Sequence, residues 1–298
     1  VDLFRWRPLS TIRVVLYGLW WLAVETIGVL LAGLLWVWHV PTGGVTSSTS
    51  QRAHSRVQRW WVRSLIKGAR TLLGLRYSVN GPEQLAHGGP LVVLARHGSQ
   101  GDALLVASVL ADAGLRPRFV IKRQLLWDPC LDLYGHRIPN YFVDRDSRDN
   151  RVEIHNIGAL ATGMARDEAL VIFPEGTRFA PAKLERAVEM LAEAAPERLD
   201  QIGQLRHVLP IRTPGVLAVL RENQEADVVL LNHIGVADFT TLGDLWRNTP
   251  FPTDLRFHVE RIDRAEVPEP SHSDELIRHL DRRWVGFDNW IHNRGVTG

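Results

Sequence analysis

The chain has a single cysteine, Cys130, among its 298 residues. One cysteine excludes an internal disulfide, and nothing beside it suggests a reactive thiol or a zinc site. An excess of one charge is also lacking, because 35 Lys and Arg residues stand against 33 Asp and Glu, a net charge of +2. This balance gives no reason to expect a nucleic-acid partner. The 12 histidines show no ligand spacing such as His-Glu-x-x-His, so no metal is expected.

Two short apolar runs each end in a group of polar residues. The first is LVVLARHGSQGD, Leu91 to Asp102, and the second is VIFPEGTR, Val171 to Arg178. Each run has the length and composition of a buried strand that feeds a loop. The sequence therefore predicts a group of functional polar residues at one edge of a sheet.

His97 and Asp102 stand five positions apart, which excludes a direct contact on one helix. Five helical steps leave two side chains about 140° apart, so the histidine must lie in a turn. Gly98 and Gly101 permit a sharp turn before a helix that begins near Asp102. A strand, turn and helix would return the carboxylate to the imidazole and leave the other ring nitrogen to accept a proton from an alcohol. On spacing alone, a capping or core histidine beside an N-cap aspartate is the more frequent meaning.

The second run is followed by an acid, a flexible backbone, a hydroxyl and a guanidinium, from Glu175, Gly176, Thr177 and Arg178. These groups suit an anionic, hydroxylated substrate. Together the two stretches resemble the glycerolipid acyltransferase family typified by lysophosphatidic acid acyltransferases, whose first motif is His-x-x-x-x-Asp and whose third is Phe-Pro-Glu-Gly-Thr-Arg. Ser99 matches a serine often found two places after the family's histidine. Arg96 stands where the family commonly has asparagine.

Two further stretches resemble the remaining motifs of that family, in the same order. Residues 141–145, YFVDR, are similar to the second motif, Phe-x-x-Arg, and residues 207–210, HVLP, are similar to the fourth. The resemblance covers roughly residues 75–290. It implies that His97 is a general base held by Asp102, that Arg145 and Arg178 bind the acceptor phosphate, and that the loop with Glu175, Gly176 and Thr177 positions the acceptor. Backbone N–H groups around Gly98 or at the helix start are candidate donors to the oxyanion, but no residue pattern assigns that role, and it stays open.

The resemblance implies transfer of a fatty acyl chain from an acyl thioester to a hydroxyl of a phosphorylated glycerol. Lysophosphatidic acid, giving phosphatidic acid, is the expected acceptor; glycerol 3-phosphate and other lysophospholipids are alternatives. No cofactor is expected, with acyl-CoA or an acyl carrier protein thioester as co-substrate. The pattern HGSQG also suggests a membrane serine hydrolase with Ser99 as nucleophile, but His97 replaces the first glycine of Gly-x-Ser-x-Gly. A non-catalytic lipid-binding protein would use the same surfaces.

The N-terminal part reads as two membrane-associated helices. Residues 14–40 are apolar apart from Glu25 and would cover roughly 40 Å as a helix. Tryptophans suited to the lipid interface are Trp20, Trp21, Trp36 and Trp38. A second helix carries basic residues at intervals of three and four, which form one stripe suited to anionic headgroups: Arg52, Arg56, Arg59, Arg63, Lys67 and Arg70. Basic residues flank the apolar helix on both sides, which favours a monotopic or re-entrant pair with the catalytic domain on the cytoplasmic face.

The alternation of apolar runs and helical periodicity from Leu75 onward predicts an α/β fold. It has the glycerolipid-acyltransferase-like form of a mixed sheet flanked by helices. Strands are expected near 75–80, 91–95, 118–121, 141–143, 170–173, 207–211, 227–232 and 255–262, and helices near 102–113, 123–134, 149–166, 182–195 and 214–222. We divide the chain into membrane-anchoring helices at 1–74, an acyltransferase domain at 75–263 and a helical extension at 264–298 that packs on the domain.

Overall fold

The computed structural model describes residues 8–40, 44, 47–86, 88–99, 101–144, 150–235 and 242–295. The strands are β1 (Tyr77–Asn80), β2 (Leu91–Ala95), β3 (Arg116–Lys122), β4 (Tyr141–Val143), β5 (Glu168–Ile172), β6 (Asp227–Ile234) and β7 (Leu255–Ile262). The longer helices are α1 (Pro8–His39), α2 (Ser48–Gly68), α4 (Asp102–Asp112), α6 (Asn150–Ala159), α7 (Pro181–Ala194), α9 (Thr213–Glu222) and α11 (Ser273–Gly295). Shorter helical segments are η1 (Ala69–Leu73), α3 (Glu83–Ala86), η2 (Arg123–Trp127), α5 (Pro129–Gly135), η3 (Pro196–Arg198), α8 (Leu199–Ile202), α10 (Leu242–Arg247) and η5 (Arg264–Glu266).

The strands form one mixed sheet with the order β1-β7-β6-β2-β5-β3-β4. Strands β6, β2, β5, β3 and β4 run parallel to one another, whereas β7 is antiparallel to β6 and β1 is parallel to β7. Strands β2 and β5 are buried along their whole length, as expected of apolar strands covered on both faces. The carboxyl ends of β2, β5 and β6 therefore meet at the middle of one sheet edge. The mixed sheet predicted from the sequence is confirmed.

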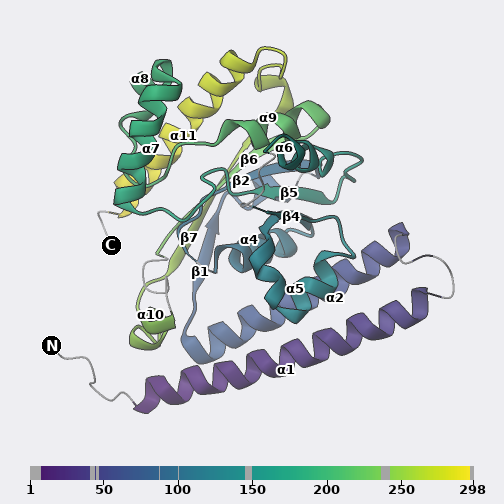
Figure 1. Ribbon diagram of the computed structural model, residues 1–298. Coiled ribbons are helices and arrows are strands. Elements are labelled where there is room, and N and C mark those ends of the chain that lie inside the picture. Colours follow the sequence, from purple (N-terminus) through teal and green to yellow (C-terminus); the bar gives the residue numbers. More distant parts are fainter. Residues whose placement is uncertain are drawn as a thin grey trace.

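Helices cover both faces of the sheet (Figure 1). One core cluster joins the sheet to α4, α2 and the inner side of α1, and the other joins it to α6, α9 and α11. The apolar stripe of α11 belongs to the second cluster: Leu276, Leu280, Trp284, Phe287 and Ile291 are all buried. The C-terminal helix thus packs on the sheet as its spacing predicts.

Helices α1 and α2 lie side by side along one side of the molecule (Figure 1). Val24 and Ala32 on α1, and Trp61 and Leu65 on α2, are buried in the same core as the sheet. Among the described residues α1 is the one helix long and apolar enough to cross a membrane, and 17% of its most apolar window is buried. Helix α2 is instead amphipathic, with a basic exposed side, so one apolar and one basic helix make up the N-terminal pair.

Two local predictions from the sequence are wrong. Residues 207–211 form a bent, irregular segment and no strand, because the N–H groups of His207 and Leu209 bond carboxylates instead of a neighbouring strand. The helix expected over 123–134 is divided into η2 and α5. The division occurs at Asp128, where a new helix begins. Pro129 has no N–H to continue the hydrogen bonds of a preceding helix, and the Asp128 side chain caps α5 by accepting the Leu131 N–H.

Candidate active site

His97 lies in the loop after β2, and Asp102 is the first residue of α4. The Nδ1 atom of His97 is 3.1 Å from Oδ2 of Asp102. The imidazole is 18% exposed, whereas the carboxylate is fully buried. Because Nδ1 faces the carboxylate, Nε2 is the nitrogen left for a substrate. The geometry is that of a general base with an orienting acid.

Asp102 also shapes the turn that carries His97. Its Oδ2 accepts the N–H groups of Gly98 at 2.7 Å and Ser99 at 2.8 Å, and its Oδ1 accepts the Ser99 hydroxyl. Burial alone would raise the pKa of this carboxyl. The nearby His233 and the hydrogen bonds from His97 and Ser99 outweigh burial, so the pKa lies below its ordinary value and Asp102 stays ionised.

These hydrogen bonds also decide two roles considered from the sequence, the donors to an oxyanion and the serine nucleophile of a hydrolase. The N–H groups of Gly98 and Ser99 are both engaged by Asp102, so neither is the donor that would meet an oxyanion. The Ser99 side chain is fully buried and its hydroxyl donates to Asp102. A serine held in this way is not placed as a nucleophile, which argues against the serine hydrolase.

Glu175 braces two loops against each other. Its Oε1 accepts the N–H of His97 at 2.7 Å, and its Oε2 accepts the N–H of Leu209 at 2.9 Å. The side chain is 1% exposed. Burial raises its pKa to about 8, although the two N–H groups and the Arg96 guanidinium act in the opposite direction. Both carboxyl oxygens thus bond backbone N–H groups of the protein and not a substrate. Glu175 therefore supports the site structurally, a role that the sequence pattern did not indicate.

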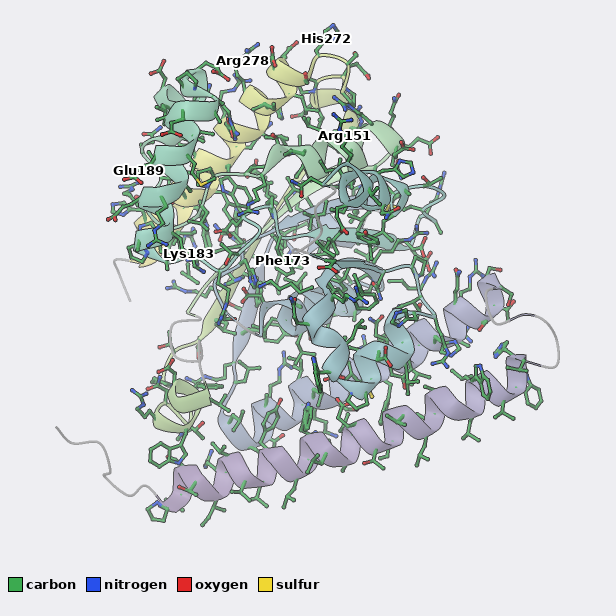
Figure 2. All side chains as sticks on the ribbon, in the orientation of Figure 1. Arg151, Phe173, Lys183, Glu189, His272 and Arg278 are labelled. Carbon is green, nitrogen blue, oxygen red and sulfur yellow. The ribbon has the colours of Figure 1, made fainter. Side chains whose placement is uncertain are left out.

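The rest of the loop after β5 packs around the histidine. The ring of Phe173, near the centre of the view in Figure 2, lies 4.9 Å from the His97 ring, and the N–H of Phe179 donates to the His97 carbonyl at 2.9 Å. Gly176 has a φ of 69°, and a Cβ there would lie 2.8 Å from Cδ of Arg212, so this position favours glycine.

Thr177 and Arg178 are partly exposed on the same loop. Lys183, labelled in Figure 2, lies at the start of α7. It donates to the Thr177 hydroxyl at 2.9 Å and to the Arg178 carbonyl at 3.0 Å. Arg178 therefore follows the same loop as Glu175 and lies close to a second cation. Arg145 falls outside the described residues, so its role stays a prediction.

Sequence reasoning missed three residues of this region. Arg96 is a buried clamp, because its guanidinium donates to the carbonyls of His233 at 2.6 Å and His207 at 3.1 Å. His233, at the end of β6, lies 3.4 Å from Asp102. Lys183 was hidden in an ordinary amphipathic helix. The departure from asparagine at Arg96 was the one available signal.

The residues expected at the membrane lie on the helix pair. Trp20, Trp36 and Trp38 are exposed at 39%, 46% and 77%, and Trp21 is half-buried. Trp20 also donates from Nε1 to the Ser64 carbonyl at 2.9 Å. Most of the basic stripe is exposed, although Arg59 and Arg63 also donate to carbonyls of Gly114 and Ala111. An open hollow of about 290 Å³ on α2 is lined by Arg56, Arg59, Trp60, Arg63, Ser64 and Lys67.

No group of three or more His, Cys, Asp or Glu side chains within the described ranges is arranged to hold a metal ion. The fold and the site thus define an α/β protein with a histidine–aspartate pair at the carboxyl edge of its parallel strands. Residues 76–213 match the family model named Acyltransferase. This part of the chain is therefore similar to the acyltransferase family.

Curated relatives carry names of the same kind. The chain is 28% identical over 223 residues to 1-acyl-sn-glycerol-3-phosphate acyltransferase epsilon of Mus musculus, covering 68% of this chain and 54% of the relative. It is 34% identical over 120 residues to lyso-ornithine lipid O-acyltransferase of Rhizobium meliloti (strain 1021), covering 40% of this chain and 38% of the relative. The chain thus spans about half, or less, of the length of these relatives.

The fold is also found in a solved structure. The 1-acyl-sn-glycerophosphate (LPA) acyltransferase PlsC from Thermotoga maritima is similar with a TM-score of 0.56 and 17% sequence identity. The similarity covers 93% of this chain and 96% of that chain. At this identity the likeness concerns the fold, including its N-terminal helices.

Proposed function

We propose that this chain transfers an acyl group from an acyl thioester to a hydroxyl of a phosphorylated glycerol lipid, with lysophosphatidic acid as the preferred acceptor. The observation that carries the proposal is the 3.1 Å contact between His97 and a buried, ionised Asp102 at the edge of the sheet. The name of the mouse relative, a 1-acyl-sn-glycerol-3-phosphate acyltransferase, supports this acceptor. The relative from Rhizobium meliloti is named for transfer to a lyso-lipid of another kind, which supports acyl transfer to a lipid but not the phosphate.

In the proposed reaction Nε2 of His97 takes the proton of the acceptor hydroxyl. The alkoxide oxygen attacks the thioester carbonyl, a C–O bond forms and the C–S bond breaks. The imidazolium then returns its proton to the leaving thiolate, so atoms and charges balance. Asp102 stabilises the imidazolium while it exists. No covalent acyl-enzyme is needed, in agreement with the buried hydroxyl of Ser99.

We assign acceptor binding to two arginines. Arg178 and Arg145 would hold the phosphate, because a guanidinium offers two parallel N–H groups to phosphate oxygens. Gly176 and Thr177 would face the glycerol, while Glu175 keeps their loop against His97. The acyl donor would be acyl-CoA or an acyl carrier protein thioester, with no cofactor.

The membrane side of the proposal rests on α1 and α2. The outer side of α1 exposes apolar residues from end to end, among them Leu9, Ile12, Leu19, Leu30, Leu34 and Val37. Since the inner side of the same helix is buried against the domain, we infer that α1 lies in one leaflet instead of crossing it. The basic stripe of α2 would bind anionic headgroups, with the domain on the cytoplasmic face.

The test is acyl transfer by the purified full-length chain, with radiolabelled acyl-CoA and lysophosphatidic acid in vesicles. We expect His97→Ala to lose at least about a hundredfold in kcat, because the general base is removed. Ser99→Ala should keep most turnover, since the hydroxyl only supports Asp102. Covalent labelling of Ser99 by the donor, or full activity of His97→Ala, would contradict the proposal. Glycerol 3-phosphate and lyso-ornithine lipid serve as competing acceptors.

A further inference from the structure

A second histidine lies on the far side of the Asp102 carboxylate. His233 ends β6 and its side chain is fully buried. Its Nε2 atom is 3.3 Å from the Arg96 carbonyl and 3.4 Å from Oδ1 of Asp102, whereas His97 approaches Oδ2. One carboxylate thus lies between two imidazoles that reach it from different strands.

The tautomer of His233 follows from its neighbours. A carbonyl can only accept, so Nε2 of His233 carries the hydrogen and donates it to the Arg96 carbonyl, while the same nitrogen lies 3.4 Å from Oδ1 of Asp102. Nδ1 is buried without a hydrogen-bond partner in the described part of the chain, and the ring centroid lies 5.6 Å from that of Phe257. His233 is therefore neutral and carries its hydrogen on Nε2, the ring nitrogen that lies near Asp102.

The surroundings keep that ring uncharged. The titratable and charged groups around it are Asp102 on α4, and Arg96 and His97 in the loop after β2; β7 contributes the phenyl ring of Phe257. Burial, with Arg96 in the same direction, outweighs the attraction of Asp102 and lowers the pKa of His233 to about 4. At neutral pH His233 is therefore uncharged and forms no ion pair with Asp102.

We propose that His233 is a positioning residue of the acyl-transfer site, whose uncharged Nε2–H fixes the second oxygen of Asp102 and limits how strongly that carboxylate holds the protonated His97. This inference rests on the proposed function. An N–H dipole at Oδ1 withdraws part of the carboxylate's negative charge from Oδ2. Without it, Asp102 would hold the imidazolium of His97 more tightly, and His97 would be a base only at higher pH.

A purely structural explanation of His233 is less satisfactory. An apolar residue would fill a site between the sheet and Phe257 without leaving a buried nitrogen unpartnered, a condition that costs about 1–3 kcal/mol. On β6, Leu230 and Leu231 are buried and apolar, and the buried Asn232 has its amide bonded to the Phe287 carbonyl and the His233 N–H. The histidine at the one position that reaches Asp102 is therefore explained by what its N–H does there.

The experiment compares the pH dependence of kcat/KM for the full-length protein and three variants in vesicles. His233→Leu removes the N–H, His233→Gln keeps an N–H donor at about the same reach, and Val229→Ala weakens the packing of β6 without touching Asp102. The acid limb of the profile reports the base of the free enzyme. We expect it to move up by about half a pH unit in His233→Leu, and to stay in place in the other two.

Two results would overturn the inference: an unshifted acid limb in His233→Leu, or an equal shift in His233→Gln. If the wild-type protein shows no acyl transfer, or if His97→Ala keeps full activity, the proposed function itself is contradicted. Failure of the inference about His233 can thus be told from failure of the proposed function. Imidazole nitrogen NMR of the wild-type protein, labelled at histidine, needs no variant to fold. An Nε2–H tautomer of His233 that persists from pH 5.5 to 8 is expected, and an Nδ1–H tautomer or a cation at pH 7 would refute it.

Discussion

At the scale of single residues, Glu175 shows how a motif residue can support a site from behind. Its carboxyl joins His97 to Leu209 through two backbone N–H groups and is buried from solvent. A glutamate that only touched substrate would not need two such bonds. The third motif therefore combines a structural acid with Arg178, three positions later, the cation to which we assign phosphate binding.

The free energy of unfolding should depend on pH through the buried carboxyl group of Glu175. Its pKa is raised from an ordinary 4.5 to about 8, so between these values the folded state holds a proton that the unfolded state has lost. The free energy of unfolding contributed by this group therefore falls as pH rises from 5 to 8. Glu175→Gln has no such titration, and its amide also replaces one acceptor. We expect it to be less stable than wild type at pH 5, with a gap that narrows toward pH 8 in urea denaturation. A gap that is constant with pH would show that Glu175 is ionised throughout.

Arg178 should act on the acceptor and not on the donor. Arg178→Ala is expected to raise the KM for lysophosphatidic acid about tenfold or more, since a charge-assisted hydrogen bond contributes about 1.5–3 kcal/mol. Arg178→Lys should restore part of the affinity, because an ammonium cannot make the forked contact. The KM for acyl-CoA is the internal control. An equal rise in both constants would assign Arg178 to the donor or to the fold.

How much of the site was predictable follows from how local each contact is. The His97–Asp102 contact was predictable because five positions and two glycines define the turn. The contact of His233 was not, because it depends on which strand lies beside β2, and Arg96 and His233 are 137 positions apart. The irregular segment at 207–211 was mistaken for a strand because an apolar run does not reveal that the N–H groups of His207 and Leu209 bond Asp288 and Glu175.

At the scale of elements, α11 supports the active site from outside the residues matched by the family model. Asp288, 2% exposed, accepts the N–H groups of Arg206 at 3.0 Å and His207 at 2.6 Å. Trp284 donates from Nε1 to the Leu209 carbonyl at 2.9 Å. The segment that these residues hold is the one that binds Glu175.

Asp288→Ala should therefore affect both stability and catalysis. Two N–H groups would lose their acceptor, at a cost of about 1–3 kcal/mol each where water cannot replace it. We expect a lower unfolding midpoint and, because Leu209 and Glu175 would shift, a lower kcat. Asn289→Ala is the matched control, since this exposed neighbour accepts from the Arg206 side chain at 2.8 Å and not from the backbone N–H groups that Asp288 holds. A loss of stability with an unchanged kcat would limit α11 to a role in folding.

At the scale of the whole molecule, the sheet, α2 and the inner side of α1 share one core. The expected limit of the anchor at residue 74 is thus a boundary in sequence, but not between separate cores. Removing both helices would expose the core around α4, so membrane binding is better tested by changes on the outer side of α1.

Leu30 and Leu34 are 61% and 67% exposed on that side. The double variant Leu30→Glu, Leu34→Glu should keep its thermal unfolding midpoint but lose vesicle binding by about a hundredfold or more, because each leucine contributes about 1.5–3 kcal/mol when buried in an apolar phase. Met190→Glu is the control, since this residue is equally exposed on α7, far from α1 (Figure 1). Sedimentation with vesicles measures both. Unchanged binding of the double variant would exclude the outer side of α1 as the lipid contact.

The outer side of α1 also determines how this protein behaves as a colloid. A row of exposed leucines, valines and tryptophans along a 32-residue helix exceeds what soluble monomers tolerate. Because the opposite side of the helix is fixed in the core, the protein cannot hide this row by refolding. In water without lipid or detergent, copies would therefore cluster through it. The particle size of a preparation would then depend on the surfactant that coats α1, and rates measured in aqueous buffer would describe clusters instead of single molecules.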